Sequence, residues 1–293
     1  MAGKNERDRR RARERFERQR QQRLQRQHKI RQWTGIGVAA AMVIGLIAGL
    51  TFAFAGGSGS AATGKSTPKA TASSSASPSA STSASAVAEP AQHCTYTTAG
   101  TAAKKVSKPS ATPDYKAGYM ATINTNLGKI NINLLNSKAT CTVNSFIHLA
   151  SADFWNASQC HRIVTTGGLY ILQCGDPIAK ADAKLTCAQT AGAPGTGGPG
   201  YEFASENLTG AKYTAGTVAM ANSGTANSNG SQFFLVYQNS TLPAQYTPFG
   251  TITSGLDILQ KVAKAGTSCH YSGAGDGAPK EKVVIDSVSV HKT

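Results

Sequence analysis

The chain has 293 residues, and its 30 lysines and arginines against 15 acidic residues give a formal net charge of +15 at pH 7. Residues 4–31 hold 13 of the basic residues and four of the acidic ones, so this stretch alone carries +9 and the rest is mildly basic. Such an uneven composition excludes a chain that is folded throughout, and indicates one globular domain preceded by segments of another kind.

Residues 1–34 form a basic arm. Clustered arginines can neutralise the phosphates of a nucleic acid, but the arm has only Phe16 and Trp33 as aromatic residues, lacks a recognisable binding motif and stops where an apolar stretch begins. We therefore expect no nucleic-acid partner, and interpret the arm as the cytoplasmic flank of a membrane anchor.

The apolar stretch Gly35–Ala55 contains no charged residue. A helix of this length, at about 1.5 Å per residue, spans a hydrocarbon layer of about 30 Å, so we predict a single transmembrane helix, or signal-anchor. The positive-inside rule places the N-terminus in the cytoplasm and everything after Gly56 outside the cell membrane. A cleaved signal peptide is the alternative, because "AFA" before Gly56 resembles a cleavage site, but the long charged region suits a retained anchor better.

Residues 56–115 are predicted to be a linker rich in Ser, Ala, Gly and Pro. Its first part, residues 56–92, has no aromatic residue and almost nothing large and apolar, so it cannot bury enough surface to offset chain entropy. A coil of this composition reaches about 30–35 Å on average and tethers a domain close to the outer face of the membrane. A disulfide of Cys94 would pin residues 93–100 to that domain.

All six cysteines follow the apolar stretch, and their even number outside the membrane favours disulfide bonds, whose connectivity the sequence leaves open. A zinc site is the alternative, since thiolates and imidazoles are zinc ligands. No spacing typical of zinc sites supports it, so we expect no metal. The six are Cys94, Cys141, Cys160, Cys174, Cys187 and Cys269.

Residues 116–293 have the pattern of a folded β domain with two helices. Alternation of apolar and polar residues predicts a hairpin over 119–135, strands in "HRIV", "LYILQC", "TAGTVAMANS" and "SQFFLVY", and a last strand in "KVVIDSVSVH". Apolar residues at helical spacing predict helices over 140–154 and 255–266. A closed β-barrel with helical caps accounts for many short strands without an exposed edge.

Three blocks of this domain resemble the cyclophilin type of peptidyl-prolyl cis-trans isomerase: "HRIV…LYILQCGDP", "VAMANSGTANSNGSQFFLVY" and "TPFGTI". The resemblance runs over nearly all of residues 118–290, and with its anchor the chain is similar to membrane-tethered bacterial members. It implies a mainly β fold, a closed eight-stranded antiparallel barrel capped by two α-helices, with a groove for proline on the outer wall. It also implies an isomerase (rotamase) that acts in protein folding on proline-containing polypeptides without a cofactor, and we expect a monomer.

The resemblance makes Arg162 the catalytic residue, with Gln173 opposite it to hold the guanidinium. Thr241 stands where the family has an aromatic residue that contacts cyclosporin, so we expect weak cyclosporin binding. Two departures are a hairpin after Arg162 that is three residues longer than usual, and one extra residue in "SGTANSNGSQ". The expected substrate-binding residues are Tyr170, Ile171, Ala221, Asn222, Ser223, Gln232, Phe234, Leu242 and Tyr246.

The chemistry can also be argued without the family. Amide resonance makes rotation about an X-Pro bond slow, with a barrier of about 18–20 kcal/mol. A guanidinium is always charged and can direct an N–H at the prolyl nitrogen, which localises the lone pair and weakens that resonance. An apolar floor beside it would exclude water and strengthen the field of the arginine.

Other residues have plainer interpretations. Phe233 and Phe234 point to opposite faces of a strand, so we assign Phe233 to the core and Phe234 to the groove. His161 is interpreted as a hydrogen-bonded structural histidine, and "GTGGPG", residues 195–200, as a loop and not a nucleotide site, because no strand precedes it.

Two alternatives to an isomerase remain open. One is a membrane-tethered module that binds proline segments and is catalytically weak, and the other is a zinc-stabilised envelope protein.

Overall fold

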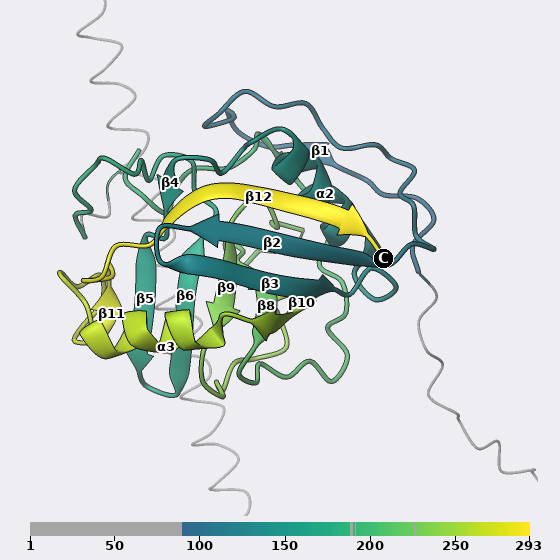
Figure 1. Cartoon of the computed structure of the whole chain (residues 1–293). Helices are drawn as coiled ribbons and strands as arrows, with labels where there is room; N and C mark the ends of the chain where they lie inside the picture. Colours follow the sequence, from purple (N-terminus) through teal and green to yellow (C-terminus); the bar gives the residue numbers. More distant parts are fainter. Residues whose placement is uncertain (1–89, 188–189, 191, 226) are drawn as a thin grey trace, which may run out of the picture. The chain divides into compact units, whose positions relative to one another are not determined.

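The computed structural model describes residues 90–293 with the exception of 188, 189, 191 and 226 (Figure 1). The predicted basic arm, the predicted transmembrane helix at 35–55 and the linker up to residue 89 lie outside the described residues. Within the described part of the chain, the longest helix has 12 residues and none has the length and apolarity needed to cross a membrane.

The domain is built on one antiparallel sheet of ten strands in the order β11-β5-β6-β9-β8-β10-β3-β2-β12-β4. The sheet curls, so that β5 and β6 run across the direction of β2 and β3 (Figure 1). Its strands are β2 (Tyr119–Thr125), β3 (Gly128–Leu134), β4 (Ser158–Gln159), β5 (Arg162–Thr166), β6 (Leu169–Cys174), β8 (Thr217–Met220), β9 (Phe233–Val236), β10 (Pro248–Ser254), β11 (Asp276–Gly277) and β12 (Val284–Lys292).

Eight of these strands have at least four residues, which agrees with the expected eight antiparallel strands. The expected closure of the barrel is not observed, because β11 and β4 are the two ends of the sheet and no ladder between described residues joins them. The edge of β5 that closure would require is occupied by β11, a two-residue strand from the loop before β12. The chain itself bridges the remaining distance, since β4 leads into β5 through Cys160 and His161.

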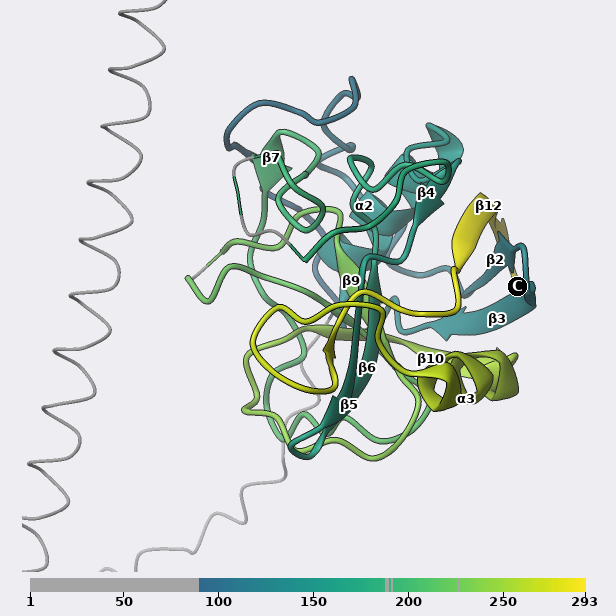
Figure 2. The ribbon, with the colours of Figure 1, turned by 90° about the vertical axis from the view of Figure 1, so that its left-hand side faces the viewer.

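Two helices lie at opposite ends of the curled sheet (Figures 1 and 2). They are α2 (Thr140–Ser151) and α3 (Leu256–Ala265), so both predicted helices are confirmed, α2 with an end three residues earlier than expected. The face of α2 that carries Val143, Phe146 and Leu149 is buried, as the helical spacing of these residues predicts. The helix α3 buries Leu259 and Val262.

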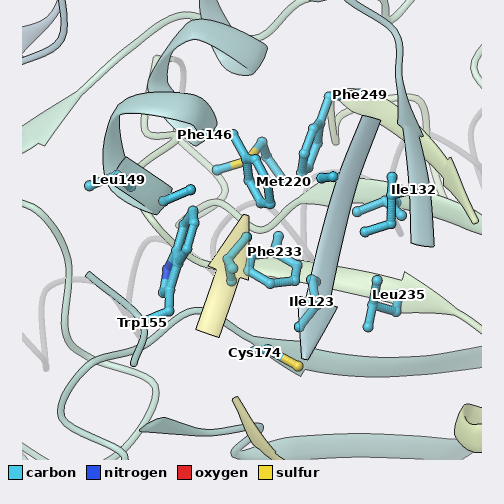
Figure 3. Packing of buried hydrophobic residues seen from close by; sticks show 14 of the residues in the cluster. Ile123, Ile132, Phe146, Leu149, Trp155, Cys174, Met220, Phe233, Leu235 and Phe249 are labelled. Carbon is cyan, nitrogen blue, oxygen red and sulfur yellow. The ribbon is translucent and has the colours of Figure 1, made fainter. Parts of the chain in front are cut away.

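The core lies between α2 and the concave side of the sheet (Figure 3). Phe233 is fully buried there, and its ring lies 5.8 Å from that of Phe146 and 5.6 Å from that of Trp155. The indole of Trp155 donates to the carbonyl oxygens of Gly175 and Ser231, both at 3.2 Å. The assignment of Phe233 to the core is thus confirmed, and the next residue, Phe234, faces the other side of the sheet.

The six cysteines form three disulfides, as predicted in kind: Cys94–Cys141, Cys160–Cys174 and Cys187–Cys269. Among the described residues no group of His, Cys, Asp and Glu is arranged to hold a metal ion, so the zinc alternative has no support there. The second bridge joins Cys160, two residues before β5, to Cys174, the last residue of β6, and so lies next to the pair of Arg162 and Gln173.

The segment 94–103 lies on the domain, although it falls within the range predicted as linker. It contains β1 (Thr97–Thr98), which pairs with β7 (Tyr201–Glu202) in a separate two-stranded ladder. Beyond β1, the amides of Ala99 and Ala103 donate to the carbonyl oxygens of Gly200 and Gly198. With Cys94 bridged to α2, the folded part of the chain begins well before residue 116.

Candidate active site

Arg162 and Gln173 are directly opposite each other in the ladder of β5 and β6. Gln173 is in turn opposite Phe234 of β9, and Phe234 is opposite Ala219 of β8. Directly paired residues of neighbouring strands point to the same face of a sheet. One row across four strands therefore places the guanidinium, an amide and an aromatic ring side by side on the convex face.

The guanidinium of Arg162 is held by two partners. Its Nε donates to Oδ1 of Asp276 at 2.7 Å and its Nη2 to Oδ2 at 3.0 Å, which is a bidentate ion pair. Its Nη1 donates to Oε1 of Gln173 at 3.3 Å. About a third of the side chain is exposed (32%), so the guanidinium is fixed at the surface of the domain and accessible to a ligand.

Gln173 continues this contact into a chain of hydrogen bonds. Its Nε2 donates to Oε1 of Gln232 at 3.0 Å, and Nε2 of Gln232 donates to the carbonyl oxygens of Gly195 and Gly197. In this series of hydrogen bonds the donated N–H groups all point away from Arg162. The side-chain oxygen of each glutamine therefore faces toward the guanidinium, and its Nε2 faces away from it. The direction of both amides is fixed by these contacts.

Residues 195–200, called the glycine loop below, are held by Asp176, which is fully buried. Its carboxylate accepts hydrogen bonds from the backbone N–H groups of Ile178, Gly195 and Gly197. The segment "GTGGPG" is therefore a loop, as predicted, and its role in this structure is to present two carbonyl oxygens to Gln232.

Beside Arg162 on the same face lies a separate apolar cluster, distinct from the core. Phe234 is at its centre, with its ring 5.6 Å from that of Tyr246 and 6.2 Å from that of Tyr213. The buried members are Val164, Ile171, Tyr213, Ala219, Phe234 and Val236, and the partly buried ones are Leu169, Ala211, Ala221, Leu242 and Tyr246.

Of the expected substrate-binding residues, the structure brings Ile171, Phe234, Leu242 and Tyr246 together but not Tyr170. The ring of Tyr170 lies on the opposite face, 6.1 Å from the ring of Tyr237, and lines a separate cavity of about 690 Å³ next to α3. Adjacent residues of a strand point to opposite faces, so Tyr170 and Ile171 cannot both belong to one floor. Leu169 takes the place expected for Tyr170.

The other members, which were not predicted from the sequence, are Val164, Ala211, Tyr213, Ala219 and Val236. For two strand residues the sequence does contain a signal, because every second residue of a strand lies on the same face. Val164 is two residues from Arg162, and Val236 is two residues from Phe234, so this period predicts both valines on the face of the site. Tyr213 lies in a loop and had no such signal; its hydroxyl is bound to the backbone of Tyr246, which it joins to the cluster.

The remaining expected residues surround an open cavity of about 450 Å³ next to Gln173. It is lined by Ala221, Asn222, Ser223 and Gln232, by the glycine loop and by residues 99–101 of the N-terminal segment. The amide of Asn222 donates to the carbonyl oxygen of Gln245, which joins the loop after β8 to the loop before β10. Apart from Tyr170, the expected site residues thus belong to an apolar cluster and to an adjacent polar cavity, with the Arg162–Gln173 pair at their border.

Comparison with known proteins identifies the family of the domain. The model of the family "Cyclophilin type peptidyl-prolyl cis-trans isomerase/CLD" matches residues 120–290, more than half of the chain. The chain belongs to this family. Its described part is a cyclophilin-type isomerase domain.

Two relatives and one solved structure illustrate the similarity. The chain is 44% identical over 212 residues to the "Probable peptidyl-prolyl cis-trans isomerase B" of Mycobacterium leprae. The aligned region covers 67% of this chain and 66% of the relative, so the chain spans just under two thirds of the relative's length. It is 32% identical over 189 residues to the "Peptidyl-prolyl cis-trans isomerase B" of Streptomyces anulatus, covering 58% of this chain and 95% of the relative. A cyclophilin-type isomerase of Cryptosporidium parvum is 24% identical, with a TM-score of 0.47 over 60% of this chain and 99% of that one.

His161 lies under the site of this cyclophilin domain and differs from expectation. Both ring nitrogens are buried without a hydrogen-bond partner among the described residues, although we predicted a hydrogen-bonded histidine. The ring is buried next to Gly195, and only its backbone groups are bonded, to Gln173 and Tyr271. Burial lowers the pKa of His161 to about 4, although Asp176 opposes the change, so the ring is neutral at pH 7.

We predict that His161 makes the stability of the cyclophilin domain depend on pH. The unfolded chain takes up a proton below about pH 6.5 and the folded chain only near pH 4, so stability falls as the pH falls through this window. Because leucine takes up no proton, we expect His161→Leu to reduce this loss in the free energy of unfolding by up to about 3 kcal/mol. Urea unfolding of both proteins at pH 7.0, 5.5 and 4.5 measures it; parallel pH profiles would contradict the prediction.

Proposed function

We propose that this protein is a peptidyl-prolyl cis-trans isomerase that accelerates rotation about X-Pro bonds in exported or cell-envelope proteins. The observation that carries the proposal is the position of Arg162, the only arginine after residue 31, at the border of the polar chain and the apolar cluster. The family to which the chain belongs is named for the same reaction.

The reaction needs no covalent step, so the residues act by orientation and by their field. The apolar cluster around Phe234 seats the pyrrolidine ring and removes water from one side of the X-Pro bond. Arg162 then directs an N–H at the prolyl nitrogen, which withdraws the lone pair from amide resonance. In a site partly shielded from water this hydrogen bond is stronger than in bulk solvent.

Gln173 and Gln232 have a different role from Arg162, because they orient its guanidinium. Gln173 binds the guanidinium and Gln232, so the two glutamines fix the direction of the arginine and form one wall of the polar cavity. The residues of the substrate on the N-terminal side of proline occupy this cavity, where Asn222 and Ser223 provide backbone and side-chain groups for hydrogen bonds.

We predict that Arg162→Ala lowers kcat/KM for a proline-containing tetrapeptide by about 100- to 1000-fold, because it removes the charged donor while leaving the apolar cluster in place. The full-length chain in a mild detergent is assayed by protease-coupled cleavage. Lys129→Ala is the control, since it removes one positive charge from an exposed position on β3. A wild-type rate no better than that of Arg162→Ala would leave only the alternative of a proline-binding module.

Weak binding of cyclosporin is a second expectation. Thr241 is exposed next to the apolar cluster, and its backbone N–H donates to the carbonyl oxygen of Gly168 in the β5–β6 turn. Its short side chain offers little surface to an apolar ligand. We predict that Thr241→Trp tightens cyclosporin binding by about tenfold through added apolar contact area, measured by titration calorimetry. Equal affinities of both proteins would contradict this reason for weak binding.

We further propose that residues 35–55 anchor the chain in the cell membrane, with the N-terminus in the cytoplasm and the isomerase domain outside. The three disulfides of the described domain support an oxidising compartment. Protease added to intact cells should remove an epitope tag placed after Thr293 and spare one placed before residue 4. Protection of the C-terminal tag, or release of the whole domain into the medium, would contradict the topology.

A further inference from the structure

The ion pair between Arg162 and Asp276 joins the site to a loop far away in the sequence. Asp276 lies in the loop between α3 and β12 (residues 266–283), 114 residues after Arg162. Within this loop, β11 pairs with β5 so that Asp276 is opposite Val164, two residues after the arginine and on the same face of the strand (Figure 1). The contact is therefore built by backbone pairing of the loop to the strand that carries Arg162.

Asp276 is itself held in one orientation. Only 14% of its side chain is exposed, and its Oδ2 accepts a hydrogen bond from the hydroxyl of Ser272 at 2.6 Å. Its backbone N–H and C=O are bonded within the loop, to Gly273 and Tyr271. Burial would raise the pKa of Asp276, but the hydrogen bonds from Arg162 and Ser272 outweigh it and lower the pKa, so the carboxylate is ionised at neutral pH.

The loop is fastened behind Asp276 by the Cys187–Cys269 disulfide. Sγ of Cys187 lies 3.4 Å from the backbone N–H of Ala278, two residues after Asp276. The backbone of the loop packs so closely that a Cβ on Gly277 would overlap the carbonyl oxygen of Cys269. The bridge thus fixes β11 from the side opposite to Arg162.

The ion pair decides which N–H bonds of the guanidinium remain for a substrate. Of five N–H bonds, Asp276 takes the one on Nε and one on Nη2, and Gln173 takes one on Nη1. One N–H on Nη1 and one on Nη2 remain. A carboxylate that accepts two bonds in a plane fixes rotation about the end of the side chain, which a single bond to Gln173 does not.

We propose that Asp276 is a positioning residue of the isomerase site: through its bidentate contact it directs the remaining N–H bonds of Arg162 toward the prolyl nitrogen, and the Cys187–Cys269 bridge holds it there. The inference rests on the proposed function. The proposal predicts the direction in which isomerase activity changes when the carboxylate is removed. A carboxylate that merely neutralised Arg162 would weaken its field, so its removal would raise activity. Removal of a positioning carboxylate lowers activity instead.

The test compares Asp276→Asn with Asp286→Asn in the full-length chain. The two substitutions remove the same charge, but Asp286 is exposed on β12, away from the site. We expect Asp276→Asn to lower kcat/KM by about tenfold, since a small misorientation of a reacting group has an effect of this order, and Asp286→Asn to leave it unchanged. Activity of Asp276→Asn equal to or above wild type would overturn the proposal.

The same substitution in an Arg162→Lys variant distinguishes a positioning role of Asp276 from a role in stabilising the fold. Lysine lacks the planar fork, so in an Arg162→Lys background the change Asp276→Asn should alter activity by less than about twofold. An equal loss in both backgrounds would mean that Asp276 only stabilises the fold. Replacing Cys187 and Cys269 together by serine should lower activity in the same direction, and Asp276→Asn should add little to it because both act on one contact.

A further readout does not depend on catalysis. In protein labelled with ¹⁵N-arginine, the Nε–H signal that Arg162→Lys removes belongs to Arg162. We expect this proton to exchange with water several-fold faster in Asp276→Asn than in wild type or Asp286→Asn, because its acceptor is lost. Unchanged exchange overturns the positioning proposal, even if the isomerase assay succeeds. Changed exchange without wild-type isomerase activity supports the contact and refutes the proposed function instead.

Discussion

The site depends on the register of three neighbouring strands. Because Arg162 is opposite Gln173, and Gln173 is opposite Phe234, a charged donor, a polar amide and an aromatic ring share one row of the convex face. A shift of register by one residue would send the guanidinium into the core and Phe233 to the surface. The packing of Phe233 against Trp155 and Phe146 opposes such a shift, so the core specifies the site although it contributes no atom to it.

Two carboxylates, the partly exposed one of Asp276 and the fully buried one of Asp176, terminate the polar row. Asp276 holds the guanidinium at one end, and at the other Asp176 holds the loop whose carbonyl oxygens accept from Gln232. Between them Arg162 and the two glutamines are each hydrogen-bonded on two sides, so these side chains have little freedom to rotate. A site that works by directing one N–H needs this rigidity, since the hydrogen bond must point at the prolyl nitrogen when the bond is half rotated.

The segments that contribute to the site are fastened by disulfide bonds in addition to the sheet. Cys187–Cys269 ties the loop of Asp276, Cys160–Cys174 ties the hairpin of Arg162 and Gln173, and Cys94–Cys141 ties the N-terminal segment that lines the polar cavity. Each bridge restricts a part of the chain that regular secondary structure alone would leave loosely held. Such a domain suits work outside the cell membrane, as we propose for it, where disulfides persist.

The sequence by itself determined the local features: both helices, the main strands, the disulfide character of the cysteines, and the pairing of Arg162 with Gln173 across a hairpin. These follow from periodicity and turn residues, which are local signals. It also determined the family, through blocks that the family model matches. Tyr170 differs from the expectation because the resemblance places both Tyr170 and Ile171 in the groove, whereas the period of two in a strand puts these neighbours on opposite faces.

Only the tertiary structure decided which cysteines pair, that the sheet stays open at β11, that the ring nitrogens of His161 have no described partner, and that Asp276 reaches Arg162. The last contact joins residues 114 positions apart through a loop with no periodic pattern. No local property of a sequence encodes such a meeting, because it depends on how the whole sheet curls and on which loop then covers the free edge of β5.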